Sequence, residues 1–160
     1  MPTLRRGEVR GLAARRPIPA PRLICADFRT FESSRPAFDY VIALQVFQHG
    51  AEADVTTYFT RVAALVRPGG LFFLRVNSAS TQIYHAHTVV ERNTMGGLTI
   101  RYDDGPKRGL LIHFFSDSEL RQHLQPAFVP SMTLREDVTL RTARKIGSWA
   151  QWESIWRRRH

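Results

Sequence analysis

Residues 38–76 decide the fold class, and they read FDYVIALQVFQHGAEADVTTYFTRVAALVRPGGLFFLRV. The stretch begins with the apolar run FDYVIALQV and ends with a second apolar run, LFFLRV. Short continuous apolar runs are typical of strands in parallel sheets, where both faces of the sheet are covered. We therefore expect two buried strands, at residues 39–44 and 71–76.

Between these runs, residues 52–67 have the pattern of an amphipathic helix. Its apolar side chains recur at three- and four-residue spacing and form one stripe, which consists of Val55, Phe59, Val62 and Val66. The sequence Pro-Gly-Gly at 68–70 then ends the helix. Because a helical crossover joins parallel strands, the stretch predicts two neighbouring parallel strands and an α/β fold.

Two segments on either side of this unit predict further β structure. The run RLICA, residues 22–26, is interpreted as a short buried strand, which makes Cys25 a small buried hydrophobic residue. Residues 80–115 alternate apolar runs with the turn-like segments NTMGG and DDGPKRG. This alternation predicts a small antiparallel meander inserted after the strand at 71–76.

The C-terminal part is predicted to contain one helix and two strands. Ser116 and Glu119 have capping-box spacing, which marks the start of a helix over residues 116–124. The segments FVPSMTLREDV at 128–138 and GSWAQWESIWRR at 147–158 follow as predicted strands.

The chain of 160 residues has a net charge of +9, and this charge lies mainly at its two ends. Six arginines against Glu8 give residues 1–22 a charge of +5, and residues 157–159 add +3. The region between them is nearly neutral, so we expect no specific nucleic-acid binding. Any such binding would be weak and salt-sensitive, because it would come from arginines outside the fold.

The composition also limits the cellular setting. No apolar run approaches the roughly 20 residues that a membrane-spanning helix needs. Cys25 is the only cysteine, so the chain forms no internal disulfide. The sequence therefore predicts a cytoplasmic protein with no membrane partner.

Polar side chains follow two of the predicted strands. Asp27 comes directly after RLICA, and Gln45 lies near the end of FDYVIALQV. In open parallel sheets, ligands bind beyond the carboxyl ends of the strands, where a carboxylate and an amide can form hydrogen bonds with them. Alternatively, Asp27 caps a turn and Gln45 is solvated. The spacing leaves both interpretations open.

The ordered set of motifs resembles the second half of a class I S-adenosylmethionine-dependent methyltransferase. The positions that match in order and spacing are Asp27–Phe28, Phe38–Asp39, His49 and Leu65–Gly70. HFFSDSELRQHL and GSWAQWESIWRR are similar to the helix after the family's fifth strand and to its last strand. The resemblance covers roughly residues 10–158. It implies an α/β, Rossmann-like methyltransferase sheet with a terminal antiparallel strand.

The family's first two strands and its glycine-rich G-x-G-x-G turn should precede these motifs, and the sequence shows no match to them. Residues 1–160 are therefore interpreted as a single, N-terminally truncated methyltransferase-like domain, with residues 80–115 as an inserted lid. Glycine at that turn allows backbone to approach the cofactor closely. We expect no calorimetrically detectable binding of S-adenosylmethionine by this chain alone, and a homo-oligomer or a completing chain as its partner.

Position by position, the resemblance implies roles for individual residues around an S-adenosylmethionine cofactor. Asp27 would meet the adenine amine, and Phe28 would stack near the adenine ring. Leu44 and Gln45 would lie beside the methionyl part. His49 would lie near the cofactor carboxylate or the substrate and is the candidate catalytic base, because imidazole titrates in a suitable range. The candidate substrate residues are Asn77, Tyr84, His85 and Tyr102.

Several functions remain open at this stage. The leading hypothesis is methyl transfer to a small-molecule acceptor. The alternative is a non-catalytic remnant of the fold that acts in assembly, and an RNA-binding module is the third interpretation. His85 and His87 would need at least a third ligand to hold a metal, and none is evident in the nearby sequence, so no metal is predicted.

Overall fold

The computed structural model describes residues 23–33, 36, 38–141 and 147–160. The chain divides into two compact units, Met1–Phe31 and Glu32–His160. Residues 4–16, an Arg- and Ala-rich segment whose composition is compatible with a helix, lie outside the described residues.

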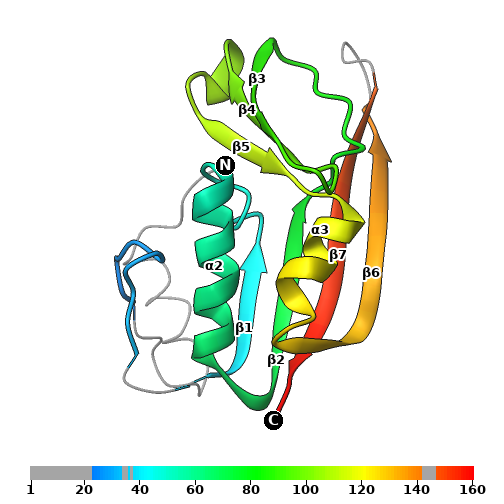
Figure 1. Ribbon diagram of the computed structural model, residues 1–160. Helices are drawn as coiled ribbons and strands as arrows, with labels where there is room; N and C mark the ends of the chain where they lie inside the picture. Colours follow the sequence, from blue (N-terminus) through cyan, green and yellow to red (C-terminus); the bar gives the residue numbers. More distant parts are fainter. Residues whose placement is uncertain (1–22, 34–35, 37, 142–146) are drawn as a thin grey trace, which may run out of the picture. The chain divides into compact units, whose positions relative to one another are not determined.

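The second unit contains the predicted strand–helix–strand arrangement (Figure 1). Strand β1 (Phe38–Leu44) pairs in parallel with β2 (Val66–Asn77), with Tyr40 opposite Leu71 and Leu44 opposite Arg75. Helix α2 (Glu52–Leu65) forms the crossover between them. The predicted parallel pair is therefore confirmed. The helix ends two residues earlier than predicted, because Val66 already has extended backbone and opens β2.

Two antiparallel strands complete a four-stranded sheet with the order β1-β2-β7-β6. Strand β7 (Ser148–Arg158) runs antiparallel to β2, and β6 (Phe128–Leu140) runs antiparallel to β7. Both strands had been predicted from the sequence. The α/β sheet with a terminal antiparallel strand is confirmed.

Helices α2 and α3 (Asp117–Leu124) lie on the same face of this sheet (Figure 1), which we call the covered face. Phe72 of β2 and Trp156 of β7 point toward the helices and are 0% exposed. The Phe47 ring joins the layers, because its centroid lies 5.7 Å from that of Phe72 and 5.6 Å from that of Phe59 in α2. The main core therefore lies between the helices and this face.

The opposite face of the sheet has no helix over it in the part of the chain that the structure describes. We call it the bare face. It carries Tyr40, Ile42 and Leu44 of β1, whose side chains are 64%, 65% and 56% exposed. The continuous apolar run had predicted a strand covered on both faces, and this prediction was wrong for the described structure, because β1 is an edge strand with cover on one side.

The predicted meander is present as a three-stranded antiparallel sheet with the order β3-β4-β5. It consists of β3 (His87–Arg92), β4 (Leu98–Tyr102) and β5 (Leu111–Phe114), with a short 3-10 helix, η1 (Gly105–Lys107), between the last two. Isolated bridges between His49 and Ile112 and between Ser78 and Phe115 join it to the ends of β1 and β2. Figure 1 shows the meander beyond the arrowheads of these two strands.

The described part of the first unit, residues 23–31, contains no strand. The predicted buried strand RLICA was therefore wrong: residues 23–26 have irregular backbone, and Cys25 is exposed rather than buried. An extended segment needs a neighbouring strand to satisfy its backbone groups, and no described strand pairs with it.

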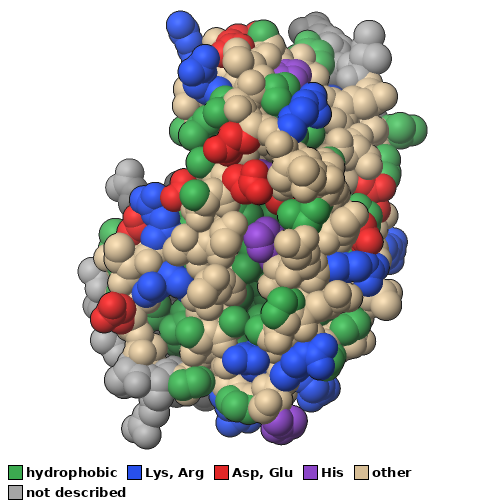
Figure 2. Space-filling model, in the orientation of Figure 1, with side chains coloured by type: hydrophobic (Ala, Val, Ile, Leu, Met, Phe, Trp, Pro, Cys, Tyr) green, Lys and Arg blue, Asp and Glu red, His purple; other side chains and the backbone are tan. Residues whose placement is uncertain are grey.

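The C-terminal arginines are part of the fold, which corrects the prediction that they lie outside it. Arg157 and Arg158 belong to β7. The Arg158 guanidinium donates from Nε to the Ala63 carbonyl at 3.0 Å and from Nη1 to the Ala127 carbonyl at 2.8 Å. On the face shown in Figure 2, acidic and basic side chains are mixed rather than gathered in one basic stripe. Among the described residues, no helix is long and apolar enough to cross a membrane.

Candidate functional site

The carboxyl ends of β1 and β2 lie side by side and form the first part of the candidate site. Gln45 directly follows β1, and its backbone amide donates to the Arg75 carbonyl at 2.8 Å, which extends the ladder by one residue. Gln45 has a φ of 59°, the one positive value among the described non-glycine residues. Left-handed backbone at a glutamine is strained, and such strain concentrates at functional sites.

Gln48, which sequence reasoning missed, fixes the geometry of both strand ends. This side chain is 2% exposed. Its Nε2 donates to Gln45 Oε1 at 2.7 Å, and its Oε1 accepts from the Asn77 backbone amide at 2.9 Å. Its backbone carbonyl also accepts from the His113 amide at 2.8 Å, so the one residue links β1, β2 and β5.

Two buried polar atoms at these strand ends have no hydrogen-bond partner among the described residues: Gln45 Nε2, a donor, and Asn77 Oδ1, an acceptor. Asn77, at the last position of β2, is 1% exposed. A buried polar atom without a partner costs roughly 1–3 kcal/mol, and in native proteins it calls for an explanation. A ligand with both acceptor and donor groups would satisfy the pair. The sequence predicted Gln45 as a cofactor-binding residue and Asn77 as a substrate residue, and the structure links the two through Gln48.

His49 lies in the turn between Gln45 and α2. Partial burial lowers the pKa of its imidazole, a hydrogen bond to the Gln45 backbone opposes this shift, and the positive charge of Lys107 lowers the pKa further. The neutral imidazole is therefore favoured at pH 7, which is the form that accepts a proton. The Tyr58 hydroxyl donates to the His49 carbonyl at 2.8 Å and holds the turn on α2.

Leu44 does not share this environment. It is on the bare face, where it lines a shallow groove with Phe73, Met132 and Ile155. Side chains alternate between the two faces of a strand. The one-residue step from Leu44 to Gln45 therefore separates a sheet-face position from a strand-end position.

The predicted substrate residues of the meander form a row of rings. The Tyr84 ring lies 5.1 Å from that of His85, and the His85 ring lies 6.3 Å from that of Tyr102. His85 Nδ1 also lies 3.0 Å from the Asp104 carboxylate. Burial raises the pKa of the Tyr102 hydroxyl, so that group remains protonated at neutral pH. The structure thus brings Tyr84, His85 and Tyr102 together.

Two further residues of this cluster had no distinctive sequence signal. Lys107 Nζ lies 5.8 Å from the ring centroid of Tyr102 and 5.3 Å from that of Trp149. Trp156 of β7 is buried and has a packing role. Trp149 instead lies beside a lysine from a loop 42 positions earlier, a proximity that no local pattern could indicate.

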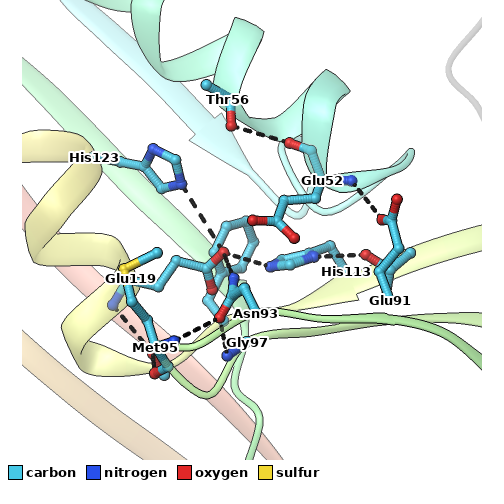
Figure 3. Close-up of polar contacts among 12 residues, drawn as sticks. Glu52, Thr56, Glu91, Asn93, Met95, Gly97, His113, Glu119 and His123 are labelled. Atoms are coloured by element: carbon cyan, nitrogen blue, oxygen red, sulfur yellow. Dashed lines mark hydrogen bonds and ion pairs between the residues drawn. The ribbon is translucent and has the colours of Figure 1, made fainter.

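A buried polar network fastens the meander to α3 (Figure 3). His113 and Glu119 are 1% and 0% exposed, and His113 Nε2 lies 2.9 Å from Glu119 Oε1. Asn93 Nδ2 donates to the same oxygen at 2.7 Å, and Thr99 Oγ1 lies 2.9 Å from His113 Nδ1. The predicted capping box is thus half formed. The Ser116 hydroxyl accepts from the Glu119 amide at 3.1 Å, but the Glu119 carboxylate points to His113.

A second contact fastens the meander to α2. The backbone amide of Glu52, in the first turn of the helix, donates to the Glu91 carboxylate of β3 at 2.9 Å (Figure 3). The meander is therefore attached to both helices, and its position over the strand ends is defined by side-chain contacts as well as by backbone bridges.

Asp27 and Phe28 belong to the first unit, whereas Gln45 and His49 belong to the second. Asp27 caps a turn: its carbonyl accepts from the amides of Thr30 and Phe31 at 3.1 and 2.9 Å. Its carboxylate is bound by Arg29 at 2.6 Å. The side-chain and backbone hydrogen bonds of Arg29 lower the Asp27 pKa to about 2. The prediction that Asp27 follows a strand end was wrong, because residues 23–26 form no strand.

The histidines of the meander have protein partners. His87 Nδ1 lies 2.9 Å from the His85 carbonyl, and His85 faces Asp104. Within the described residues, no three His, Cys, Asp or Glu side chains are grouped closely enough to hold a metal ion.

Comparison with solved structures identifies the fold. The chain matches a 1,6-didemethyltoxoflavin-N1-methyltransferase from Burkholderia thailandensis with a TM-score of 0.60 and 18% identity, over 98% of this chain and 59% of that chain. It matches an S-adenosylmethionine-dependent methyltransferase from Methanosarcina mazei with a TM-score of 0.60 and 14% identity, over 97% and 79%. The fold is that of a class I methyltransferase.

A third match has the same character. The N-methyltransferase NodS from Bradyrhizobium japonicum, solved with S-adenosyl-L-homocysteine, aligns with a TM-score of 0.55 and 12% identity over 96% of this chain and 61% of that chain. The chain thus spans between 59% and 79% of these methyltransferase-fold proteins. No family model matches the sequence, and no curated protein matches it.

Proposed function

We propose that this chain supplies the methionyl side and the acceptor side of an S-adenosylmethionine-dependent methyl-transfer site for a small-molecule substrate. The observation that carries the proposal is the pair of partnerless buried atoms at the ends of β1 and β2, next to the strained backbone of Gln45. The methyltransferase fold supports it, because ligands of open α/β sheets bind at these strand ends.

The residues present fit one end of the cofactor. The amino-acid end of S-adenosylmethionine carries a carboxylate and an ammonium group. Gln45 Nε2 is a donor that suits the carboxylate, and Asn77 Oδ1 is an acceptor that suits the ammonium. When bound, the cofactor supplies an electrophilic methyl group.

The other residues would act on the acceptor. His49, with its lowered pKa, would accept the proton of an acceptor that must lose one. The meander over the strand ends would exclude water and orient the acceptor, and orientation supplies much of the acceleration in a direct displacement. Tyr84, His85 and Tyr102 would contact the acceptor from that side.

The resemblance implied that Asp27 and Phe28 meet the adenine, and this stays a prediction. The Asp27 carboxylate is already occupied by Arg29. The matched proteins have longer chains, and we propose that a completing segment or chain provides the remaining contacts. Full activity would then require that completion.

A second function is favoured by the bare face. Tyr40, Ile42 and Leu44 together expose an apolar surface of the kind that often marks a protein interface. This surface supports an assembly role for the fold, with or without catalysis.

The proposed cofactor contact can be tested by nuclear magnetic resonance on side-chain amides. S-adenosylmethionine is titrated to millimolar concentration into the chain, and the NH₂ signals of Gln45 and Asn77 are followed. Both signals should shift. The Asn93 signal serves as the matched control and should not move, because Glu119 already binds that amide in the buried network.

A variant sharpens the assignment. Gln45→Glu replaces the partnerless donor by an acceptor and should suppress the Asn77 shift, since a cofactor carboxylate would then be repelled. Unmoved Gln45 and Asn77 signals at millimolar cofactor would contradict the proposal.

A further inference from the structure

The Lys107 ammonium of η1 lies over two aromatic rings. Its Nζ lies 5.8 Å from the Tyr102 centroid and 5.3 Å from the Trp149 centroid. The lysine is half-buried, and this burial lowers its pKa. Cation–π contacts with two rings fix the direction of the ammonium group.

No described carboxylate compensates this charge. The two acidic residues nearest in sequence have other partners: Asp104 faces His85 at 3.0 Å, and Asp103 accepts from Thr88 Oγ1 at 2.8 Å. The Lys107 ammonium thus has no carboxylate partner among the described residues. It remains available to an anion from outside the chain.

The cationic groups around Tyr102 also favour an anionic ligand. Arg141 is close enough to Tyr102 for its positive charge to lower the pKa of the Tyr102 hydroxyl, against the larger effect of burial. Lys107 acts in the same way on His49. Two cationic groups, Arg141 and Lys107, thus lie near Tyr102, and cations attract anionic ligands.

The rings beside Lys107 favour a planar ligand. Tyr84 is 48% exposed, and its ring starts the row that continues through His85 to Tyr102. Aromatic side chains in this arrangement offer both faces and edges to a further ring. A planar aromatic ligand can contact this row while its charged group reaches the ammonium.

The loop that carries Lys107 is positioned before any ligand arrives. Gly105 has a φ of 71°, and a Cβ at this position would lie 2.6 Å from the His85 ring. Glycine therefore allows the loop to lie directly against His85, which also binds Asp104. A binding group that is already in place loses less entropy when the ligand binds.

We propose that Lys107, with the rings of Tyr102 and Trp149, anchors the acceptor, and that this acceptor is an aromatic molecule carrying an anionic oxygen. That the bound molecule is the methyl acceptor rests on the proposed function. That an aromatic anion binds at Lys107 does not. The anchor is also near His49, the candidate base. The positive charge of Lys107 would favour the ionised form of a carboxyl or phenol group bound there.

The test uses 4-hydroxybenzoate as the probe and 4-hydroxybenzamide as its neutral analogue, each titrated into the chain without S-adenosylmethionine. Binding is followed by the indole N–H signal of Trp149, assigned with Trp149→Phe. The benzoate should bind at least about tenfold more tightly than the amide, a difference of about 1.4 kcal/mol. Lys107→Met should remove this preference, and Lys107→Arg should retain it.

Arg92→Met is the matched control, because Arg92 is an exposed cation on β3 of the same meander. It should leave the preference unchanged. Equal affinity for the two probes, or an unchanged preference in Lys107→Met with a native-like spectrum, would overturn the proposal. Because the cofactor is absent from this titration, a positive result here together with unmoved Gln45 and Asn77 signals would reject the proposed function alone.

Discussion

The two faces of the four-stranded sheet differ in how much of their apolar side chains is covered. On the covered face, Phe72 and Trp156 are 0% exposed beneath α2 and α3. On the bare face, Ile42 is 65% exposed although it lies in the same sheet. Both faces belong to the same hydrogen-bonded sheet. The difference in exposure therefore arises from what packs on each face.

The comparison separates residues that stabilise this chain from residues that are apolar for another reason. Phe72 removes its whole side chain from water within the described unit, so it contributes to folding. Ile42 leaves most of its side chain in water and contributes little until something covers it. Similar residues in one sheet therefore have different roles.

The largest expected effect comes from a paired substitution on the two faces. Phe72→Ala should lower the free energy of unfolding by about 3–5 kcal/mol, because it removes a fully buried ring. Ile42→Ala should change it by no more than about 0.5 kcal/mol. Urea unfolding of both variants measures the difference. Equal losses would show that the bare face is covered in solution.

A smaller effect is expected where the meander meets α3. A Cβ at Gly97 would lie 2.1 Å from Glu119 Oε2. Gly97→Ala should therefore destabilise the chain by about 1–3 kcal/mol through overpacking. Thermal or urea unfolding checks this value. A neutral result would mean that Glu119 does not occupy the space beside Gly97.

The capping of α3 should contribute less. The Ser116 hydroxyl accepts from the Glu119 amide at 3.1 Å and donates to the Met95 carbonyl at 2.6 Å. Ser116→Ala should cost about 1 kcal/mol, within the usual range for N-caps. Ser118→Ala is the control, because Ser118 is exposed in the same helix. Urea unfolding should give a lower free energy of unfolding for Ser116→Ala than for Ser118→Ala. Equal values would contradict the capping role of Ser116.

The smallest effect concerns Asp27, which lies outside the core. Arg29 lowers the Asp27 pKa from its usual 3.8 to about 2. The stabilising contribution of this pair is therefore present above pH 3.8 and is lost as the pH falls through about 2. A carboxyl titration by nuclear magnetic resonance should show the low value, and Arg29→Met should return the pKa toward 3.8. An unchanged pKa in that variant would contradict the assignment to Arg29.

The sequence predicted the parts of the fold that depend on local periodicity. The helical stripe from Val55 to Val62 and the two apolar runs predicted β1, α2 and β2, and Ser116 predicted the start of α3. The sequence did not predict that RLICA lacks a strand, because strand formation needs a partner that a local pattern cannot supply.

The candidate site was likewise predicted only where it depends on local sequence patterns. Gln45 and Asn77 could be placed because strand ends can be read from the sequence. Gln48 could not, since its role depends on reaching β2, 29 positions further along the chain. Lys107 was missed because it lies in η1, whereas its neighbour Trp149 lies on β7, 42 positions further along the chain.

The central proposal is that Gln45 and Asn77 contact the amino-acid end of S-adenosylmethionine and that a completing segment or chain supplies the adenine side. Calorimetric titration of the 160-residue chain with S-adenosylmethionine tests it most directly. Each missing hydrogen bond to a charged group removes about 1.5–3 kcal/mol, and each ~1.4 kcal/mol is tenfold in affinity. We predict binding at about millimolar strength, which shifts the side-chain amide signals but is too weak to produce a measurable heat. Micromolar binding would contradict it, because the chain would then already contain a complete cofactor site.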